Sequence, residues 1–342
     1  MGLLNFGKAG IAIDLGTANT LIVQNDTIVL NEPSIIAINT LSGELVAFGK
    51  KALLMHEKTH SYIKTIRPLK DGVISNFNAC QQMIRVMIKN INQSKTFLLR
   101  GIEKMIISIP YGATEVEKRA VRDSAEYAGA KELYMIHEPI AAAMGLGLNV
   151  SEAEGSMIVD IGGGTSEIAV ISLAGVVCNQ SLKMAGDSLS NEIVDYMRRE
   201  HNLLIGERTA ERIKIEVGAA ITDLENPPAA MEVIGRDMMT GLPKCKKINY
   251  GEIAETLDKS LSMIEDAVIK TLENCPPELA GDIYEKGIFL TGGGSGLRGL
   301  DIRIRKRTQL PIHASENSLT SVINGANMSL KNLNTMKHIM IR

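Results

Sequence analysis

The sequence predicts an α/β fold made of two similar lobes. Apolar strands alternate with helices along the chain, as in layered α/β domains. An Asp that ends an apolar strand and precedes a glycine turn occurs at Asp14, and the same arrangement returns at Asp160. A repeat at the scale of a domain indicates two related lobes rather than a solenoid of short repeats. The length of 342 residues also suits two domains better than one.

The predicted elements follow from the spacing of apolar residues. In the first half, we expect strands at 11–14, 20–24, 27–31, 34–39 and 104–110, and helices at 79–91, 115–128 and 140–145. In the second half, we expect strands at 156–160, 166–172, 175–180, 231–235, 245–248 and 287–291, and helices at 188–200, 207–217 and 251–273.

Composition excludes several classes of protein. A net charge of −2 gives no reason to expect a nucleic-acid partner. The four cysteines are scattered singly, which supports neither a zinc ribbon nor a disulfide framework. No signal peptide or apolar run of about 18 residues is present, so we expect a cytoplasmic protein without a membrane span.

The two Asp-glycine motifs have the chemistry of a phosphate clamp. A carboxylate at a strand end can hold Mg²⁺ through water, since Mg²⁺ keeps part of its hydration shell. The glycines that follow let the backbone present several N–H groups to phosphate oxygens, and nearby hydroxyls add donors. A third glycine cluster follows a buried strand and precedes a helix, so it can approach a nucleotide closely. The three motifs are Asp14 with Gly16 and Thr17, Asp160 with Gly162, Gly163, Gly164, Thr165 and Ser166, and Gly292, Gly293, Gly294 with Ser295.

In this order, the three motifs resemble those of the actin/heat-shock-70/sugar-kinase superfamily. Longer stretches are similar to the bacterial actin family MreB, namely 30–34, 66–73, 155–160, 204–214 and 276–280. The similarity covers nearly the whole chain. It implies an actin-like two-lobed fold, in which duplicated mixed-sheet, ribonuclease H-like domains surround a nucleotide cleft.

The resemblance also implies four subdomains. The core of the first lobe comprises 1–36, 71–151 and 319–342, and its small subdomain comprises 37–70. The core of the second lobe comprises 152–187 and 252–318, and its small subdomain comprises 188–251.

The resemblance assigns roles to matching positions. Asp14 and Asp160 would be the Mg²⁺-side carboxylates, and Gly292–Ser295 would border the adenosine of ATP or ADP. The phosphates would be lined by Gly16, Thr17, Ala18, Asn19, Gly162, Gly163, Gly164 and Thr165. The nucleoside would be contacted by Ala210, Glu211, Arg212, Ile213 and Lys214.

Glu138 would orient the attacking water in a slow ATP hydrolysis, coupled to Thr165 across the cleft. A carboxylate suits this task, because loose phosphoryl transfer mainly needs positioning and charge neutralisation. The alternative is a carboxylate favoured at a helix start by the helix dipole. His137 stands where the family often has a second acidic residue.

Two other motifs match known site patterns but do not support the corresponding sites. His56-Glu57-Lys58-Thr59-His60 matches the zinc-protease pattern, but no third ligand motif follows it, and we expect a polar helix end. Residues 294–299 match a dinucleotide fingerprint, but too little chain follows them to complete such a domain.

Apolar and basic segments indicate a membrane surface. Phe97, Leu98 and Leu99 lie between polar and cationic residues, which suits shallow insertion into an anionic bilayer. Packing onto the core is the alternative. The family inserts a hydrophobic loop here, so the resemblance favours membrane contact at the inner face of the cell membrane. The basic C-terminal tail is either a second membrane-surface segment or a solvated, partly disordered end.

The leading functional hypothesis is a filament-forming ATPase that helps to determine bacterial cell shape. The resemblance implies that copies of the chain form nucleotide-dependent, antiparallel paired protofilaments. Membrane proteins of a cell-elongation complex are further candidate partners. The rivals are a heat-shock-70-type chaperone and a sugar-kinase-type enzyme, which use the same clamp.

Overall fold

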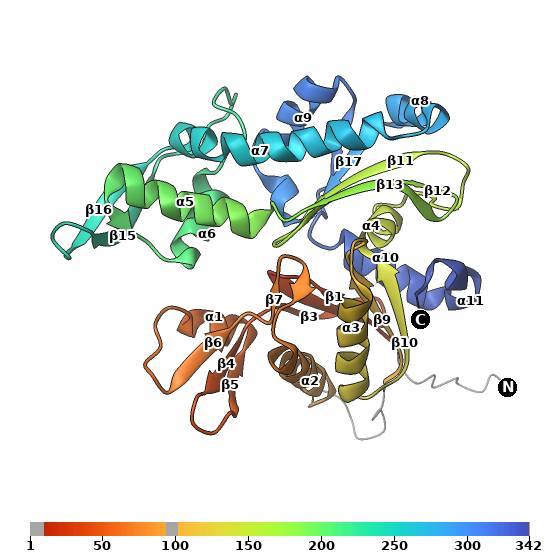
Figure 1. The fold of residues 1–342 in the computed structure, drawn as a ribbon, viewed down its shortest axis with the longest axis horizontal. Coiled ribbons are helices and arrows are strands. Elements are labelled where there is room, and N and C mark those ends of the chain that lie inside the picture. Colours follow the sequence, from red (N-terminus) through yellow and green to blue (C-terminus); the bar gives the residue numbers. More distant parts are fainter. Residues whose placement is uncertain (1–9, 94–101, 342) are drawn as a thin grey trace. The chain divides into compact units, whose positions relative to one another are not determined.

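The computed structural model describes residues 10–93 and 102–341 (Figure 1). The chain divides into two compact units, Met1–Val150 with Thr320–Arg342, and Ser151–Leu319. Within the described residues, each unit is built on a five-stranded mixed sheet. The finer division into four subdomains stays a prediction.

The sheet of the first unit has the strand order β10-β9-β1-β2-β3. The strands are β1 (Ile11–Leu15), β2 (Asn19–Gln24), β3 (Thr27–Pro33), β9 (Ile102–Ile109) and β10 (Ala130–His137). Strand β1 pairs antiparallel with β2 and parallel with β9. Because β1 is the central strand, its apolar residues Ile11 and Ile13 are buried, and Asp14 follows them at the end of the strand.

Helices complete the core of the first unit. Met83 and Met87 of α2 are fully buried in the same cluster as the sheet residues, as their helical spacing predicts. Helix α3 begins with a capping box between Thr114 and Glu117. The small-residue helix α4 packs against α10 (Figure 1). The helices are α1 (Gly49–Met55), α2 (Phe77–Gln93), α3 (Glu115–Tyr127), α4 (Glu138–Gly145) and α10 (Ser321–Lys331), and the smaller strands are β4 (Ile36–Asn39), β5 (Leu45–Phe48), β6 (Ile63–Ile66), β7 (Leu69–Lys70) and β8 (Val73–Ile74).

The zinc-protease pattern lies after α1 rather than on it. The helix ends at Met55, and Glu57 has a positive φ of 60°. A zinc pair spaced by four residues must lie on one helical face, which this backbone does not provide. His56 Nδ1 instead shares a hydrogen bond of 2.8 Å with Thr65 Oγ1.

The sheet of the second unit has the order β13-β12-β11-β17-β18. The strands are β11 (Ser156–Ile161), β12 (Ser166–Ser172), β13 (Gly175–Leu182), β17 (Ile288–Thr291) and β18 (Ile312–Ala314). Strands β11 and β12 are buried along their whole length, and β11 pairs antiparallel with β12 and parallel with β17. Asp160 of β11 is aligned with Thr291 of β17, so the second and third glycine motifs follow neighbouring strand ends.

The second unit carries its helices and a small sheet after β13. The long helix α7 starts with a capping box between Asn249 and Glu252. The sequence pattern does not predict helix α8, because its two leading prolines favour a connection, although Pro277 is compatible with the first helical turn. The elements are α5 (Gly186–His201), β14 (Leu203–Leu204), α6 (Glu207–Val217), β15 (Met231–Asp237), β16 (Pro243–Ile248), α7 (Tyr250–Glu273), α8 (Pro277–Lys286), the 3₁₀ turn η1 (Gly293–Gly296) and α9 (Leu300–Thr308).

The C-terminal tail packs on the first unit. After α10 the chain continues as α11 (Leu333–Met336) and the 3₁₀ turn η2 (Lys337–Ile339), and Leu333 and Ile339 are buried. The N–H of Met135 donates to the carbonyl of Ile341 at 2.8 Å, and the N–H of Ile341 donates to the carbonyl of Met135 at 2.9 Å. The expectation of a solvated, partly disordered tail is therefore wrong through Ile341, since its apolar residues have a buried surface to occupy.

Candidate functional site

The first Asp-glycine hairpin is a tight turn held by a neighbouring strand end. Leu15 pairs with Thr20, so residues 16–19 form the turn between β1 and β2. Ser34 secures it on two sides, because its hydroxyl donates to the carbonyl of Gly16 at 2.6 Å and its N–H donates to the carbonyl of Ala18 at 2.9 Å. A Cβ on Gly16 would lie 2.7 Å from the carbonyl oxygen of Asn19, so the turn has no room for a side chain there.

The side chains of this turn face different surroundings. Thr17 is buried, and its hydroxyl accepts a hydrogen bond from the N–H of Gly72 at 3.1 Å. The hydroxyl hydrogen of Thr17 stays available to donate. Ala18 is half-buried and Asn19 is exposed. Sequence reasoning missed the supports Ser34 and Gly72, which lie far from the motif along the chain.

The carboxyl group of Asp14 lies in a desolvated position. Burial raises the pKa of Asp14 to about 6, and a hydrogen bond from the Ser108 hydroxyl, at 2.8 Å, partly opposes the shift. Sequence reasoning also missed Ser108, although its place near the end of the strand before Pro110 was a usable signal, because β9 runs parallel to β1. A carboxyl group with this pKa gains from a cation that stabilises its charged form.

The second hairpin turns its carbonyl groups toward a helix start. The N–H of Gly186 donates to the carbonyl of Gly162 at 3.0 Å, and the N–H of Asp187 donates to the carbonyl of Gly163 at 2.7 Å. Because the C=O and N–H of a trans peptide point in opposite directions, the N–H groups of Gly163 and Gly164 point away from α5. Two neighbouring N–H groups on one side of a turn form a concavity suited to an anion.

The third glycine cluster lies directly on Asp160. Gly292 has a φ of +80°, and a Cβ there would overlap with Asp160 Oδ1 and with the carbonyl of Ile161. Asp160 itself is only 7% exposed. Inside the cluster, Ser295 Oγ donates to the carbonyl of Gly292 at 2.7 Å. The structure therefore brings Asp160 and Gly292–Ser295 together, as the shared edge of β11 and β17 requires.

Helix α6 contributes two of its five predicted side chains to this neighbourhood. Lys214 Nζ donates to the carbonyl of Gly186 at 2.7 Å, to Ser190 Oγ at 3.0 Å and to Glu211 Oε2 at 2.7 Å. The same Glu211 oxygen accepts from the Ser190 hydroxyl at 2.8 Å. Glu211 and Lys214 thus lie beside the helix start that holds the second hairpin, and Ser190 is a further residue that sequence reasoning missed.

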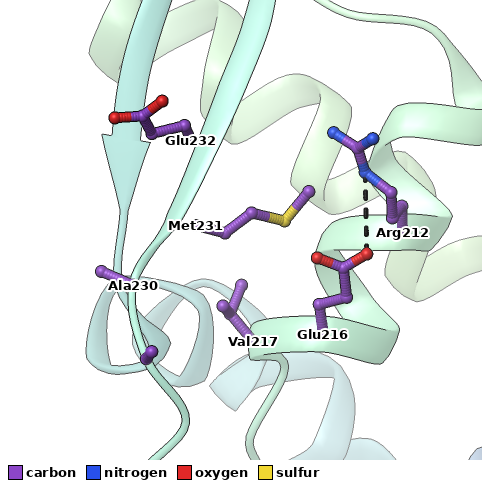
Figure 2. A pocket seen from close by; sticks show the side chains of 7 residues that line it. Arg212, Glu216, Val217, Ala230, Met231 and Glu232 are labelled. Atoms are coloured by element: carbon purple, nitrogen blue, oxygen red, sulfur yellow. Dashed lines mark ion pairs between the residues drawn. The ribbon is translucent and has the colours of Figure 1, made fainter.

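The other three side chains of the run 210–214 lie elsewhere, as a helical period demands. Ala210 and Ile213 are fully buried in the hydrophobic core. Arg212 Nε lies 3.9 Å from Glu216 Oε1 and lines a surface hollow of about 520 Å³ (Figure 2). Met231 and Val217 supply apolar walls of this hollow (Figure 2).

Glu138 is the first residue of α4 and is half-buried. His137 precedes it as the N-cap residue, without a side-chain capping bond. The His137 ring packs against Tyr111 at 4.7 Å between centroids, and burial, with a smaller effect of Lys118, lowers the pKa of His137. The lowered pKa favours the neutral form of His137, which adds no positive charge beside Glu138. The coupling of Glu138 to the half-buried Thr165 stays a prediction.

The predicted membrane residues Phe97, Leu98 and Leu99 lie outside the described residues. Among residues 10–93 and 102–341, no helix is both long enough and apolar enough to cross a membrane.

Comparison with known proteins identifies the family. The family model described as MreB/Mbl protein matches residues 8–338. The cell shape-determining protein MreB of Escherichia coli (strain K12) is 46% identical over 326 residues, covering 94% of this chain and 93% of the relative. The cell shape-determining protein Mbl of Bacillus subtilis (strain 168) is 42% identical over 327 residues, covering 95% and 97%.

Solved structures agree on the fold. MreB5 of Spiroplasma citri bound to AMPPNP has a TM-score of 0.90 and 37% identity, and the match covers 97% of this chain and 98% of that one. A MamK double helical filament has a TM-score of 0.75 at 19% identity, covering 95% and 99%, which shows a shared fold. The predicted actin-like fold is confirmed, and this chain belongs to the MreB/Mbl family of actin-like, cell shape-determining proteins.

Proposed function

We propose that this chain binds ATP with Mg²⁺, hydrolyses it slowly and assembles with copies of itself into filaments at the inner face of the cell membrane. The second hairpin carries the proposal, because its Gly163 and Gly164 N–H groups face away from α5 while the Gly292 cluster closes on Asp160. Nucleotide binding is supported by the MreB5 structures of Spiroplasma citri, which were solved with AMPPNP and with ADP. That both hairpins act on one nucleotide stays a prediction from the sequence.

The residues fit a magnesium ion. Mg²⁺ prefers oxygen ligands and is often held by one or two carboxylates together with substrate phosphates. Asp160 is a buried carboxylate against the backbone of Gly292, and the raised pKa of Asp14 favours a cation partner. When bound, the ion would neutralise charge on the phosphates. The carboxylates of Asp14 and Asp160 would hold its water ligands, and Gly16–Asn19, Gly162–Thr165 and Gly292–Ser295 would position the nucleotide.

Hydrolysis is assigned to Glu138, with Thr165 as its partner. Glu138 is half-buried at the start of α4, whose following residues are buried, so packing fixes the backbone that would aim its carboxylate at a water molecule. We expect Glu138→Ala to keep ATP affinity while phosphate release falls about 100-fold, a typical contribution for such a group. Phosphate release and ATP affinity are measured on the same folded preparation. Release at the wild-type rate would remove Glu138 from the reaction.

Filament assembly and membrane attachment are separable in one experiment. Three apolar side chains at 97–99 contribute at most about 1.5–3 kcal/mol each when fully buried, and less on shallow insertion. One subunit should therefore bind a bilayer weakly, whereas a filament repeats the contact and binds by avidity.

We expect Phe97→Ser/Leu98→Ser/Leu99→Ser filaments to sediment with ATP but to lose most flotation with anionic vesicles. Failed sedimentation without lipid would show instead that the three residues serve packing. Undiminished flotation would move the attachment to another segment.

A further inference from the structure

Two arginines that follow the Gly292 cluster reach back to the end of helix α6. Arg298 Nη1 donates to the carbonyl of Ile215 at 3.0 Å and to that of Gly218 at 3.3 Å. Helix α6 ends at Val217, so this guanidinium satisfies carbonyl groups at a helix C-terminus, where a cation is also favoured by the dipole. The N–H of Ala220 in turn donates to the carbonyl of Arg298 at 2.7 Å.

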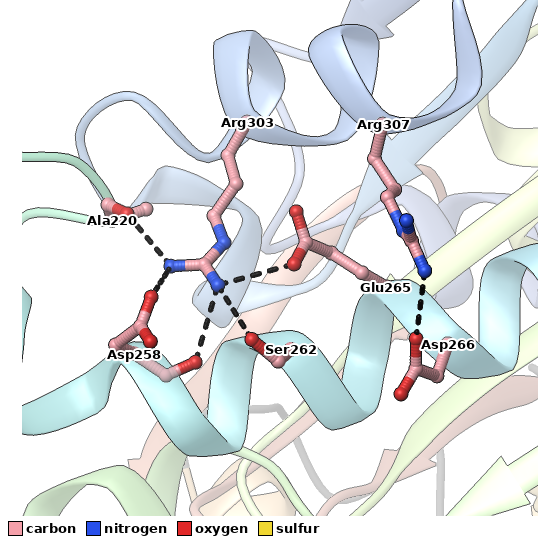
Figure 3. Close-up of polar contacts among 7 residues, drawn as sticks. All are labelled: Ala220, Asp258, Ser262, Glu265, Asp266, Arg303 and Arg307. Carbon is pink, nitrogen blue, oxygen red and sulfur yellow. Dashed lines mark hydrogen bonds and ion pairs between the residues drawn. The ribbon is translucent and has the colours of Figure 1, made fainter.

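Arg303, one turn into α9, ties the same segment to α7 (Figure 3). Its Nη1 donates to the carbonyl of Ala220 at 3.1 Å and lies 2.8 Å from Asp258 Oδ1. Its Nη2 donates to Glu265 Oε2 at 3.1 Å, to Ser262 Oγ at 2.9 Å and to the carbonyl of Asp258 at 3.1 Å. The side chains of Arg303 and Glu265 are only 12% and 11% exposed, so this is a desolvated pair rather than a surface contact.

The basic run at 303–307 is thus not one charged surface. Arg303 is largely enclosed by acceptors, while Arg307 is 55% exposed and pairs with Asp266 at 3.3 Å (Figure 3). Arg307 lies one turn further along the same helix. It therefore provides a matched control for any effect of removing a guanidinium from α9.

Arg298 and Arg303 connect the two segments that border the proposed adenosine position. Helix α6 carries Glu211 and Lys214, and the chain from Gly292 to Ser295 leads directly into Arg298. The side chain of Arg298 joins the end of α6 to the segment after the glycine cluster, and that of Arg303 joins Ala220 to α7. The carbonyl groups of Gly162 and Gly163 are bound by the start of α5 rather than by either arginine.

We infer that Arg298 and Arg303 form a clasp that fixes the spacing of α6 and the glycine cluster, and thereby sets affinity for the nucleoside part of the nucleotide. The inference rests on the proposed nucleotide site. Both arginines act through the residues that they hold, so they are positioning residues. A lysine cannot replace Arg303, since one ammonium group cannot bridge Ala220, Glu265 and Ser262 in a fixed fork.

The test compares ligands with and without a nucleoside. ADP and inorganic tripolyphosphate, each with Mg²⁺, are titrated by calorimetry into the full chain and into three variants, Arg303→Met, Arg303→Lys and Arg307→Met. Thermal unfolding is followed in parallel. Arg303→Met leaves Glu265 buried without its cation, so it should lower the melting temperature. Arg303→Lys keeps a cation near Glu265 and should retain most of the stability.

For the clasp, we expect about tenfold weaker ADP binding in both Arg303 variants, with tripolyphosphate affinity within twofold of wild type. Arg307→Met should match wild type for both ligands. Wild-type ADP affinity in folded Arg303→Lys would overturn the clasp, and so would a parallel loss of tripolyphosphate affinity. Failure of the unmodified chain to bind ADP would instead refute the proposed function, on which the clasp depends.

Discussion

The two Asp-glycine hairpins share a pattern but are held by different means. In the first, Ser34 secures the turn through two hydrogen bonds, and the N–H of Gly72 adds one to the Thr17 hydroxyl. In the second, the start of α5 takes the turn carbonyls, and the Gly292 cluster covers Asp160. One copy of the duplicated motif is thus held by residues next to short strands, and the other by a helix start and a second glycine cluster.

The two carboxyl groups, of Asp14 and Asp160, depend on backbone packing to different degrees. The carboxyl group of Asp14 has a hydroxyl partner and a raised pKa, so its state responds to pH and to a bound cation. Asp160 lies against a glycine backbone that admits no side chain. Changes at Gly292 should therefore act mainly through sterics, and changes at Asp14 mainly through charge.

The largest expected effect is that of Gly292→Ala. A methyl group would overlap with Asp160 Oδ1 and the Ile161 carbonyl, and the φ of +80° is unfavourable for alanine. We expect a loss of roughly 3 kcal/mol or more in the free energy of unfolding, together with loss of ATP binding. Urea denaturation and calorimetry measure the two effects. The control is Gly296→Ala, where a Cβ meets nothing within 4 Å. Equal stabilities of the two variants would contradict the steric account.

Asp14→Asn is expected to raise the free energy of unfolding, by less than Gly292→Ala lowers it. The folded-state pKa, about 6, lies above the ordinary value of 3.8, so the folded state binds the proton more tightly than the unfolded state does. Asp14 therefore favours folding below pH 4, and this contribution is lost as the pH rises through 6.

At pH 7, without nucleotide or metal, Asp14→Asn should raise the free energy of unfolding by up to about 3 kcal/mol, and by little at pH 4. Denaturation curves at the two pH values measure this effect. The variant should also bind Mg·ATP more weakly. Lower stability than wild type at pH 7 would show that the charged form of Asp14 is stabilised in the folded chain.

The smallest expected effect is that of Ser108→Ala. Its hydroxyl stabilises the charged form of Asp14, so its removal should raise the pKa of Asp14 further and cost about 1 kcal/mol at pH 7. The midpoint of the pH dependence of Mg·ATP affinity reports the change. We expect it to move to higher pH, and a shift to lower pH would mean that Ser108 opposes ionisation. Ser34→Ala should leave this midpoint in place, since Ser34 binds the turn backbone.

Local pattern allowed the two hairpins to be predicted, because each lies within a run of adjacent strands. The expected strands 11–14 and 20–24 correspond to β1 and β2, and 156–160 and 166–172 correspond to β11 and β12. The partners of these hairpins were not predictable in the same way. Ser108 reaches Asp14 only because β9 pairs with β1, a contact between residues 94 positions apart.

Helical geometry explains why only two of the five predicted residues of α6 lie beside the start of α5. A run of five consecutive residues covers more than one helical turn, so it cannot point all its side chains to one ligand. Lys214 and Glu211, three apart, share a face, whereas Arg212 lies beside the hollow with Glu216. The sequence predicts the start of α5 at Ser188, two residues after its observed start at Gly186, so it does not predict the backbone donors of Gly186 and Asp187.

The pairing of Ile341 with Met135 has a consequence for how this protein is handled. Strand β10 is the outermost strand of its sheet, and the tail occupies main-chain donors and acceptors that another strand could otherwise bind. Deleting the tail to remove its charges would therefore expose unpaired main-chain groups of β10. Such groups favour non-native association, which resembles filament growth in a sedimentation assay. Charge reversals at Lys337 and at other exposed tail positions keep that edge closed, so they separate electrostatics from self-association.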